Sequence, residues 1–468
     1  MHVKFMLPAL VEPQDIHWRS IKYSLFPPLG RATLAGYLDD NDFAEIVDEH
    51  VAPLRLDDKP DLVAIEVYVT SAYRAYRIAD TYRVRGIPVA LGGLHPTACP
   101  EEAARQADSL VLSPAEEAWP RFLNNFRLGH PAPIYRSRCR DLTSSPFIRR
   151  DLISSNRYLV PNSVVLSRGC PHRCDFCYSN FFFRGGRHFY TMQIKQAIEE
   201  IGALPGRHLF FFDDNIFGDR SFAMSLFREM RGMRRVWQGA ATVQSILDDK
   251  FLDLAVESGL RSLFVGFESL NQEEMIRYGK RHNRVTQYKR AVKMLHERGV
   301  MINGSFVSGL DGDDDSVFTA TTEWAIANGI ETATFHILTP YPGTDLFNRY
   351  LALGRIRHQD WDLYDTRHAV FHSPKMTAKT LEKGYRLAYE TFYGWKNIVR
   401  SGLHKDSTLD KIRHIAYVGA WKKIGPIWSL LISLRKLQIA IPALETVLTG
   451  KQNNCPVFHI LHNRDIYS

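Results

Sequence analysis

Short apolar runs that alternate with helix-like segments constrain the fold of this chain more than any other feature. In residues 1–130 the runs HVKFMLPAL, DLVAIEVYV and IPVALGG each end near Gly, Pro or Asp, and helical patterns such as GRATLAGYL lie between them. This is the pattern of βαβ units that form a parallel sheet. We therefore expect residues 1–130 to fold as a doubly wound, Rossmann-like α/β domain.

A second series of the same kind follows. Residues 131–160 are polar, contain several Pro and Arg, and are expected to be a linker. Residues 161–345 hold six further β-like runs with helices between them, which predicts a partial (β/α)6 barrel. Residues 346–468 are predicted to be a helical C-terminal domain. The predicted fold class is α/β, and 468 residues with 45% apolar side chains suffice for several cores.

The overall charge indicates no particular macromolecular partner. Lys and Arg number 59 against 51 Asp and Glu, which gives a formal net charge of +8; this mild excess does not indicate nucleic-acid binding. The chain has neither a signal-peptide pattern nor about 20 consecutive apolar residues, so we expect a cytoplasmic protein. Because cytoplasmic thiols stay reduced, closely spaced cysteines there indicate metal binding or redox chemistry rather than disulfides.

Three cysteines lie close together in the stretch SRGCPHRCDFCYSN. Cys170, Cys174 and Cys177 directly follow the first β-like run of the second series, and α/β barrels place their chemistry at that end of a strand. A structural zinc site normally has four protein ligands, whereas a cubane iron–sulfur cluster held by three thiolates keeps one iron open. A zinc site completed by His172 or His188 is the alternative.

The spacing C-x3-C-x2-C, with Phe176 before the last cysteine, resembles the signature of the radical S-adenosylmethionine (SAM) enzymes. The resemblance implies that Cys170, Cys174 and Cys177 hold a [4Fe-4S] cluster whose open iron chelates SAM. It also implies one-electron reduction of the sulfonium to give a 5′-deoxyadenosyl radical, with a flavodoxin- or ferredoxin-like protein as the electron donor.

Several further residues are candidates for this site. The run LFFFDDN ends in acidic groups that suit the ammonium of SAM, although two carboxylates there could instead cap the next helix. The phrase FVGFES resembles the fourth-strand region of radical SAM enzymes, which approaches the ribose and the methionine. The candidate SAM contacts are Phe176, Asp213, Asp214, Asn215 and Glu268, and the candidate catalytic or pocket residues, chosen from their places at strand ends, are Tyr178, His336 and Tyr341.

The N-terminal region resembles the cobalamin-binding domain of one class of radical SAM enzymes, through SLFPPLGRATLAGYL and ALGGLHPTACPEEA. The resemblance implies cobalamin contacts at residues 25–30 and 91–95, namely Leu25, Pro28, Gly30, Gly92, Gly93 and His95. The pattern Asp-x-His-x-x-Gly, which supplies a cobalt ligand in other cobalamin proteins, is absent, so His95 is not expected to bind cobalt. Where many members carry Gly-x-Gly-Glu, this chain has LSPAEEAWP, whose proline stiffens the loop.

These resemblances imply a cobalamin-dependent radical SAM enzyme that methylates an unactivated carbon of a small-molecule or natural-product intermediate. One alternative keeps the architecture but cyclises, oxidises or rearranges its substrate. The other is an iron–sulfur redox or sensor protein that does not use SAM. The basic, tryptophan-containing residues 411–451 suggest either a peripheral membrane contact or a buried helix of a cap domain.

Overall fold

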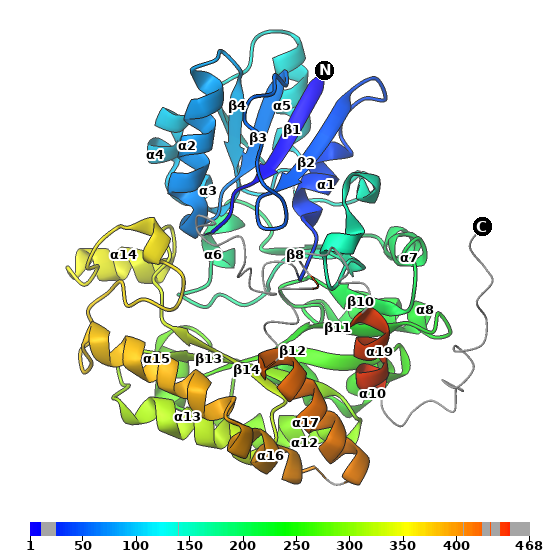
Figure 1. Cartoon of the computed structure of the whole chain (residues 1–468), viewed down its shortest axis with the longest axis vertical. Helices are drawn as coiled ribbons and strands as arrows, with labels where there is room; N and C mark the ends of the chain where they lie inside the picture. Colours follow the sequence, from blue (N-terminus) through cyan, green and yellow to red (C-terminus); the bar gives the residue numbers. More distant parts are fainter. Residues whose placement is uncertain (11–24, 139, 406, 424–430, 432–439, 450–468) are drawn as a thin grey trace.

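The computed structural model describes residues 1–10, 25–138, 140–405, 407–423, 431 and 440–449. Two α/β units lie one above the other, with the N-terminal sheet at the top of Figure 1 and the larger second sheet below it. Helices from the C-terminal part run along the lower unit. The fold class predicted from the sequence is confirmed.

The first sheet has six strands in the order β2-β1-β3-β4-β5-β6, and every neighbouring pair is parallel. In such a doubly wound sheet a ligand crevice forms at the carboxyl ends of the strands where the strand order reverses, here β1 and β3. The strands are β1 (His2–Leu7), β2 (Phe43–Asp48), β3 (Leu62–Glu66), β4 (Val89–Gly92), β5 (Ser109–Leu112) and β6 (Ile134–Arg136), connected mainly by α1 (Leu29–Ala35), α2 (Ala72–Arg83), α3 (Leu94–Ala98), α4 (Pro100–Ala103) and α5 (Ala118–Arg127).

The second sheet also has six parallel strands, in the order β14-β13-β12-β11-β10-β7. No pairing joins β14 to β7 among the described residues, so the barrel is open on one side. Its strands are β7 (Ser163–Val164), β10 (His208–Phe211), β11 (Val236–Ala241), β12 (Leu260–Glu268), β13 (Met301–Ser308) and β14 (Thr332–Ile337), and its main helices are α7 (Ile194–Gly202), α8 (Arg220–Met230), α10 (Asp249–Glu257), α11 (Gln272–Arg277), α12 (Tyr288–Glu297) and α13 (Ser316–Ala327).

A short antiparallel hairpin precedes the helices of the barrel. It pairs β8 (Ser167–Gly169) with β9 (Phe189–Thr191), and α6 (Ser179–Phe182) lies between them. The hairpin closes the segment that carries the three cysteines. Thus that segment is anchored at both ends.

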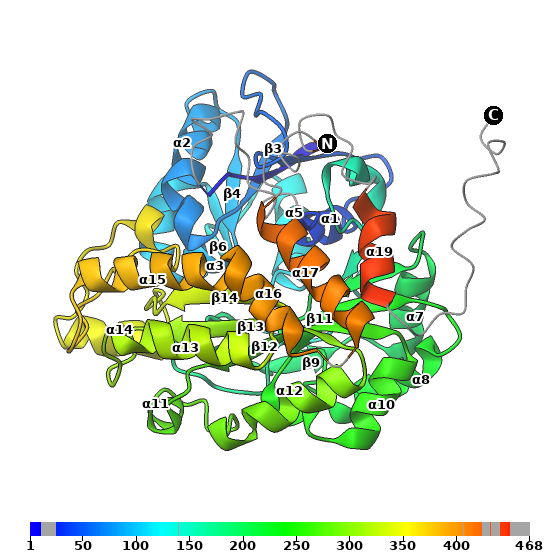
Figure 2. The same cartoon turned by 60° about the horizontal axis from the view of Figure 1, so that its bottom comes forward.

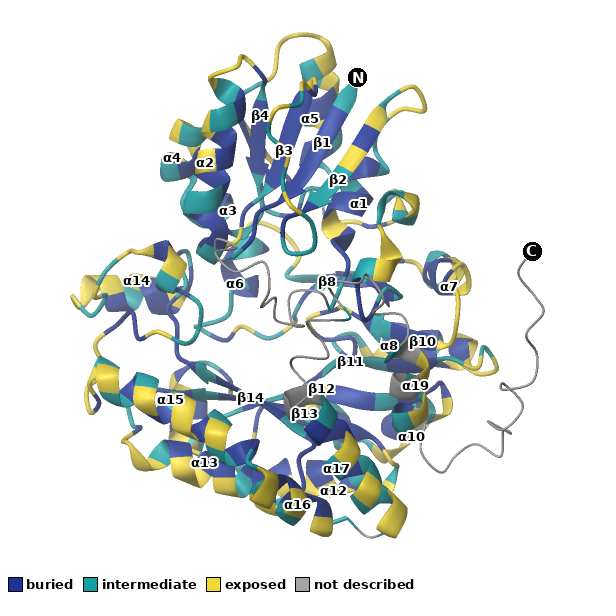
Figure 3. Ribbon diagram, in the orientation of Figure 1, coloured by how far each residue is buried: buried dark blue, intermediate teal, exposed yellow. Residues whose placement is uncertain are grey.

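The C-terminal helices cover the lower unit, and along α15 and α16 exposed positions alternate with buried ones (Figure 3). They are α14 (Asp345–Ala352), α15 (Ala378–Phe392), α16 (Trp395–Leu403), α17 (Thr408–Lys423) and α19 (Ile441–Thr449). The segment after the barrel returns to the N-terminal unit, because Trp361 and Tyr364 are buried in the same apolar cluster as Val63 and Ile65 of β3. The two units therefore share a core.

The basic residues 411–451 are only partly described. Much of the region for which the sequence suggested a membrane contact, namely residues 424–430, 432–439 and 450–451, lies outside the described residues. Within α17, Tyr417 and Val418 are buried. No helix among the described residues is both long enough and apolar enough to cross a bilayer.

Candidate active site

The three cysteines lie in one loop between β8 and α6. The loop is held by backbone contacts: the Cys177 N–H donates to the Cys174 carbonyl at 3.0 Å, and the Asn180 side chain donates to the same carbonyl at 2.8 Å. The Asp175 N–H donates to the Tyr278 carbonyl at 3.1 Å. All three thiols are free. A preformed loop of this kind can bind a cluster without large rearrangement.

The three thiols must lose their protons before they can bind a metal. Burial raises the pKa of Cys174 to about 12 and raises those of Cys170 and Cys177, so metal binding must displace protons from them. In this structure the sulfur atoms of the three cysteines are not all within 4.8 Å of one another. The same holds for any three possible ligand atoms that include a ring nitrogen of His172 or His188. One zinc ion at 2.3 Å from each sulfur would require about 3.8 Å between them.

The two aspartates after β10 have different surroundings. Asp213 is buried, and its Oδ1 accepts hydrogen bonds from the Leu166 N–H at 3.1 Å and from the N–H and hydroxyl of Ser167 at 2.5 Å each. Burial raises the pKa of Asp213 to about 6, although these donors lower it. Neither aspartate caps the next helix, because the N-cap of α8 is Asp219.

Asp214 faces the open interior instead. Its Oδ1 accepts a hydrogen bond from the Tyr178 hydroxyl at 2.5 Å. Asp214 lines the cavity, but the surrounding protein desolvates its carboxylate, and this raises the pKa of Asp214. An ammonium group placed here would restore the ionised form. Next to it, the buried Asn215 accepts from the Phe217 N–H at 3.2 Å, and Phe176 packs against the barrel core.

Glu268 ends β12 in an unusual conformation. Its φ of +67° and a register shift after Gly266 turn the side chain toward the interior. Lys280 Nζ donates to Glu268 Oε1 at 2.5 Å, and Ser305 Oγ lies 3.4 Å from Oε2. Burial alone would lower the pKa of Lys280, but Glu268 and Cys174 outweigh it and raise that pKa. Lys280, which sequence reasoning missed, thus places a buried cation between Glu268 and the cysteine loop.

Two neighbouring cavities lie between the sheets. The smaller, of about 330 Å³, is bounded by Gly30 of α1, Glu66 at the end of β3, and Gly92 and Gly93 after β4, together with residues of the cysteine segment. Glu66 stands at the reversal of strand order, where the topology predicts a ligand crevice. The larger, of about 840 Å³, extends into the barrel. The cavities share the lining residues Glu66, Gly93, Tyr178, Phe182, Phe212 and Asp214.

Two glycines at the smaller cavity have different structural roles. Gly93 has a φ of +104°, and a Cβ there would lie 3.0 Å from the Val67 carbonyl oxygen, so its turn requires glycine. At Gly30 a Cβ would meet only Glu66 Oε2 at 3.4 Å. Gly30 therefore keeps the cavity open rather than relieving strain. The neighbouring Arg31 pairs with Glu66, and its buried Nε has no partner among the described residues.

His95 does not line either cavity. It is fully buried, with Nε2 3.0 Å from the Tyr76 hydroxyl and 3.2 Å from Glu102 Oε1, and its ring packs edge-on against Trp361. Trp361 Nε1 donates to Glu102 at 3.1 Å. This network joins α3 and α4 to the segment after the barrel, so the contacts of His95 are those of a structural residue.

The remaining residues predicted from the sequence to contact cofactor or substrate lie in different surroundings. Leu25 lines the larger cavity, whereas Pro28 is the N-cap residue of α1. His336 of β14 approaches Thr366 Oγ1 at 3.1 Å through Nδ1, and burial lowers the pKa of His336. Tyr341 packs against the core shared with the N-terminal unit, and burial raises its pKa.

The larger cavity has aromatic walls that the sequence did not predict. Phe210 and Phe212 of the β10 region, Phe264 of β12, and Tyr389, Tyr393 and Tyr417 of the C-terminal helices line it. Among the described residues, Asn303 Oδ1 and Thr334 Oγ1 are buried there without a hydrogen-bond partner. Alternation along β12 to β14 is the signal that could have indicated these inward-facing side chains.

Comparisons with known proteins agree with this geometry. Residues 164–325 match the model of the radical SAM superfamily. The chain is 31% identical over 346 residues to bacteriochlorophyllide d C-12(1)-methyltransferase of Chlorobaculum tepidum, covering 71% of this chain and 75% of that protein. It is 28% identical over 391 residues to the C-8(2)-methyltransferase of the same organism, covering 78% and 85%.

The fold also resembles a solved structure. The radical SAM methyltransferase TsrM from Kitasatospora setae, with cobalamin and a [4Fe-4S] cluster bound, superimposes with a TM-score of 0.63 at 15% identity, covering 95% of this chain and 100% of that one. The structure has an open barrel with a three-cysteine loop after its first strand, and a Rossmann-like domain lies next to this barrel. These features define a radical SAM enzyme with an accessory domain. The chain belongs to the radical SAM superfamily, among its C-methyltransferases.

Proposed function

We propose that the protein is a cobalamin-dependent radical SAM enzyme that methylates an unactivated carbon of a large, mainly apolar natural-product intermediate. The observation that carries the proposal is the pair of connected cavities between the two parallel sheets. The smaller lies at the carboxyl ends of β3 and β4, the larger extends from the end of β10 along the inner face of the barrel to the first residues of β14, and the cysteine segment borders the smaller one. When bound, the cluster and SAM supply a hydrogen-abstracting radical, and cobalamin supplies the methyl group. The protein binds these groups, orients them and excludes water.

Cys170, Cys174 and Cys177 would hold the cluster. Asp214 would accept the ammonium of SAM, because it is a desolvated carboxylate that faces the interior and already holds Tyr178 at 2.5 Å. Glu268 would approach the ribose, with Lys280 fixing its position at 2.5 Å. Asp213 would act indirectly, since its hydrogen bonds fix the start of the β8 strand that leads into the cysteine loop.

Cobalamin would occupy the smaller cavity and the border of the larger one. Gly30 leaves space on the cavity wall, and the unpartnered Arg31 Nε offers a donor for a polar group of the cofactor. Gly92 and Gly93 allow close approach to the end of β4. Because His95 is engaged with Tyr76 and Glu102, no histidine among the described cavity residues would reach the cobalt.

The substrate would enter the larger cavity. Aromatic walls favour an extended apolar body, and the unpartnered Asn303 and Thr334 would bind a polar group at its inner end. By their names, both methyltransferases compared above act on bacteriochlorophyllide d, so we propose a substrate of that class. A one-electron donor of the flavodoxin or ferredoxin type would reduce the cluster.

The test is anaerobic reconstitution with iron, sulfide and cobalamin, followed by turnover with SAM that carries a CD3 group. A bacteriochlorophyllide-type substrate should gain one CD3 group, as measured by mass spectrometry. The triple variant Cys170→Ala/Cys174→Ala/Cys177→Ala should give no product. A product formed without gain of a carbon would assign the protein to cyclisation or oxidation chemistry instead.

A further inference from the structure

The larger cavity has acidic but no basic side chains in its walls. Of the described residues that line it, Glu66, Asp213 and Asp214 are acidic, and none is Lys, Arg or His. Arg31, which lines the smaller cavity and not the larger one, pairs with Glu66. A carboxylate inside the larger cavity would therefore meet no unpaired cation among the described residues, and burial of an unpaired charge is strongly unfavourable.

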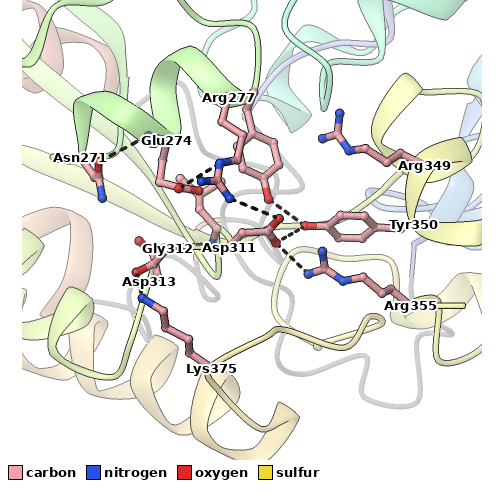
Figure 4. A network of polar contacts seen from close by, with 12 residues as sticks. Asn271, Glu274, Arg277, Asp311, Gly312, Asp313, Arg349, Tyr350, Arg355 and Lys375 are labelled. Carbon is pink, nitrogen blue, oxygen red and sulfur yellow. Dashed lines mark hydrogen bonds and ion pairs between the residues drawn. The ribbon is translucent and has the colours of Figure 1, made fainter. Parts of the chain in front are cut away.

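Basic side chains around the rim of the barrel have carboxylate partners of their own. Lys280 pairs with Glu268 at the end of β12. Arg355 donates to Asp311 at 2.8 Å, and Arg277 lies 4.0 Å from the same carboxylate, as Figure 4 shows. These cations are therefore engaged with acids outside the larger cavity and do not change the character of its walls.

Along the sheet of the barrel, the larger cavity is lined by neutral polar side chains. They come from four neighbouring strands, β11 to β14, and the strand register places Gln238 beside Ser262 and Asn303 beside Thr332. None of these side chains is charged near neutral pH. We call this set the polar floor, and it consists of Gln238, Ser262, Asn303, Thr332 and Thr334.

Two members of the polar floor have hydrogen-bonding atoms that no described residue satisfies. Asn303 Oδ1 and Thr334 Oγ1 are buried without a partner, whereas Gln238 Nε2 lies 2.7 Å from His208 Nε2. A carboxamide and a hydroxyl can each donate and accept a hydrogen bond. They therefore suit a neutral group such as a hydroxyl or a carbonyl, because a buried carboxylate requires a cation or several donors.

The polar floor begins beside the proposed SAM site. Ser305 of β13 is the register partner of Thr334, and its Oγ lies 3.4 Å from Glu268 Oε2. Register partners of a parallel pair point to the same face of the sheet, so Ser305 and Thr334 lie side by side. A group bound at Thr334 thus belongs to a molecule that reaches the residues proposed to hold SAM.

The tyrosines of α15 contribute rings rather than hydroxyls to the cavity. The Tyr389 hydroxyl accepts from the Phe335 N–H at 3.2 Å and donates to the Phe335 carbonyl at 3.4 Å. The Tyr393 hydroxyl contacts the N–H and carbonyl of Ala333 at 3.1 and 2.9 Å in the same way. Both serve the free edge of β14, the last strand of its sheet, beside which α15 lies in Figure 2. Hydrogen bonding to a ligand is therefore left mainly to the polar floor.

We propose that the larger cavity binds an uncharged part of the substrate, namely an apolar body that carries a hydroxyl or carbonyl group hydrogen-bonded to Asn303 and Thr334. A substrate that also carries a carboxylate keeps that group outside this cavity. The inference deepens the proposed function and rests on it, because the bound molecule is taken to be the one that is methylated.

The test uses two probes that share a flat apolar body and differ in one terminal group. Pyrenebutanol ends in a hydroxyl, and pyrenebutyrate ends in a carboxylate that is ionised at neutral pH. Equilibrium dialysis of each probe against the full-length protein, reconstituted with iron, sulfide and cobalamin, gives the two dissociation constants. The value for pyrenebutanol should be lower by about tenfold or more. Equal values would overturn the proposal.

Two substitutions at Thr334 locate the preference in the polar floor. Thr334→Val keeps the branched shape but removes the hydroxyl, so the dissociation constant for pyrenebutanol should rise about three- to tenfold. Thr334→Lys adds a cation and should shift the preference toward pyrenebutyrate. The controls are Thr319→Val and Thr319→Lys, at an exposed position of α13, and they should bind both probes as the unmodified protein does. Unchanged binding of pyrenebutanol by Thr334→Val would contradict the assignment even if Thr334→Lys does not fold.

Transfer of a CD3 group separates this inference from the proposed function. A protein that transfers CD3 to its substrate but binds both probes equally would retain the proposed function and lose the charge selection. A protein that prefers pyrenebutanol but transfers CD3 to no bacteriochlorophyllide-type or other apolar substrate would overturn the proposed function, and with it the role of the cavity in holding a methylated substrate.

Discussion

Arg168 donates through Nε to Glu116 Oε1 at 2.8 Å, and this ion pair joins the two α/β units beside the cysteine loop. Arg168 belongs to β8 and lies two residues before Cys170, whereas Glu116 lies in the loop after β5. That loop is the LSPAEEAWP stretch, and its Ser113 adopts a φ of +65°. The stiff loop therefore positions an acid for contact with the strand that leads to the cluster.

Replacement of Glu116 should loosen this connection. In Glu116→Gln the mostly buried Arg168 loses its charged partner, so we expect a loss of about 1–3 kcal/mol in the free energy of unfolding. Urea denaturation monitored by tryptophan fluorescence measures it. The control is Glu257→Gln, whose exposed pair with Arg231 should matter by less than about 0.5 kcal/mol. Equal stability of the two variants would contradict a structural role for the pair.

The sequence was sufficient to predict the alternation of strands and helices along the chain and the fold class, because hydrophobic periodicity and Gly, Pro or Asp at the ends of the runs are local signals. The cysteine loop was also predictable, since its spacing is encoded in eight residues. The roles of Asp213 and Asp214 could not be separated from the sequence. Adjacent residues at the end of a strand face opposite sides of the sheet, and only the fold shows that Asp213 is the one that contacts Ser167. Lys280 was missed for a related reason: its contact with Glu268 depends on the bulge that gives Glu268 a positive φ.

Cluster assembly should require displacement of protons. Burial raises the pKa of all three thiols, that of Cys174 to about 12, so iron binding should strengthen as the pH rises and should release protons. Reconstitution between pH 7 and 9, followed by the iron–sulfur absorption and by proton release in weakly buffered solution, checks this. Removal of the cluster by a chelator should leave the fold intact, because the loop is held by its own hydrogen bonds. Global unfolding on chelation would show that the cluster is structural.

The two aspartates should respond differently to substitution. Asp214→Ala should weaken SAM binding by about 1–3 kcal/mol, as expected for the loss of one charge-assisted hydrogen bond, with little change in stability. Asp213→Ala should instead lower the free energy of unfolding, because it leaves the buried donors of Leu166 and Ser167 without their acceptor. Calorimetry with SAM and urea denaturation of both variants separate these effects. Similar SAM affinity in Asp214→Ala and the unmodified protein would remove Asp214 from the SAM site.

A buried ion pair behind the barrel gives a pH-dependent contribution to stability. Glu331 pairs with Lys405 and accepts from the Ile302 N–H at 2.8 Å, and although burial opposes ionisation, Lys405 and His296 hold the pKa of Glu331 well below its usual value. Because the folded-state pKa is depressed, the stabilisation is complete above pH about 4.5 and is lost as the pH falls through the folded-state pKa.

Glu331→Gln should therefore lower the free energy of unfolding by about 3–5 kcal/mol at pH 7, since Lys405 stays buried without its carboxylate. The difference from the unmodified protein should shrink toward low pH, as followed by urea denaturation at several pH values. Glu323→Gln, which breaks an exposed pair with Arg400, is the matched control and should show a small difference at every pH. A pH-independent deficit would exclude the ion pair as its cause.

Cobalamin binding should depend on Gly30 and not on His95. In Gly30→Leu the new side chain extends from α1 into the smaller cavity without backbone strain, because its Cβ meets only Glu66 Oε2 at 3.4 Å. We therefore expect cobalamin occupancy to fall sharply while the unfolding transition stays near that of the unmodified protein.

His95→Ala should lower stability, since it removes the contacts with Tyr76 and Glu102. The cofactor that this variant binds should nevertheless keep its visible spectrum, which reports the ligands of the cobalt. A spectral change in His95→Ala, together with unchanged occupancy in Gly30→Leu, would place the corrin on the opposite side of β4 and contradict the proposed site.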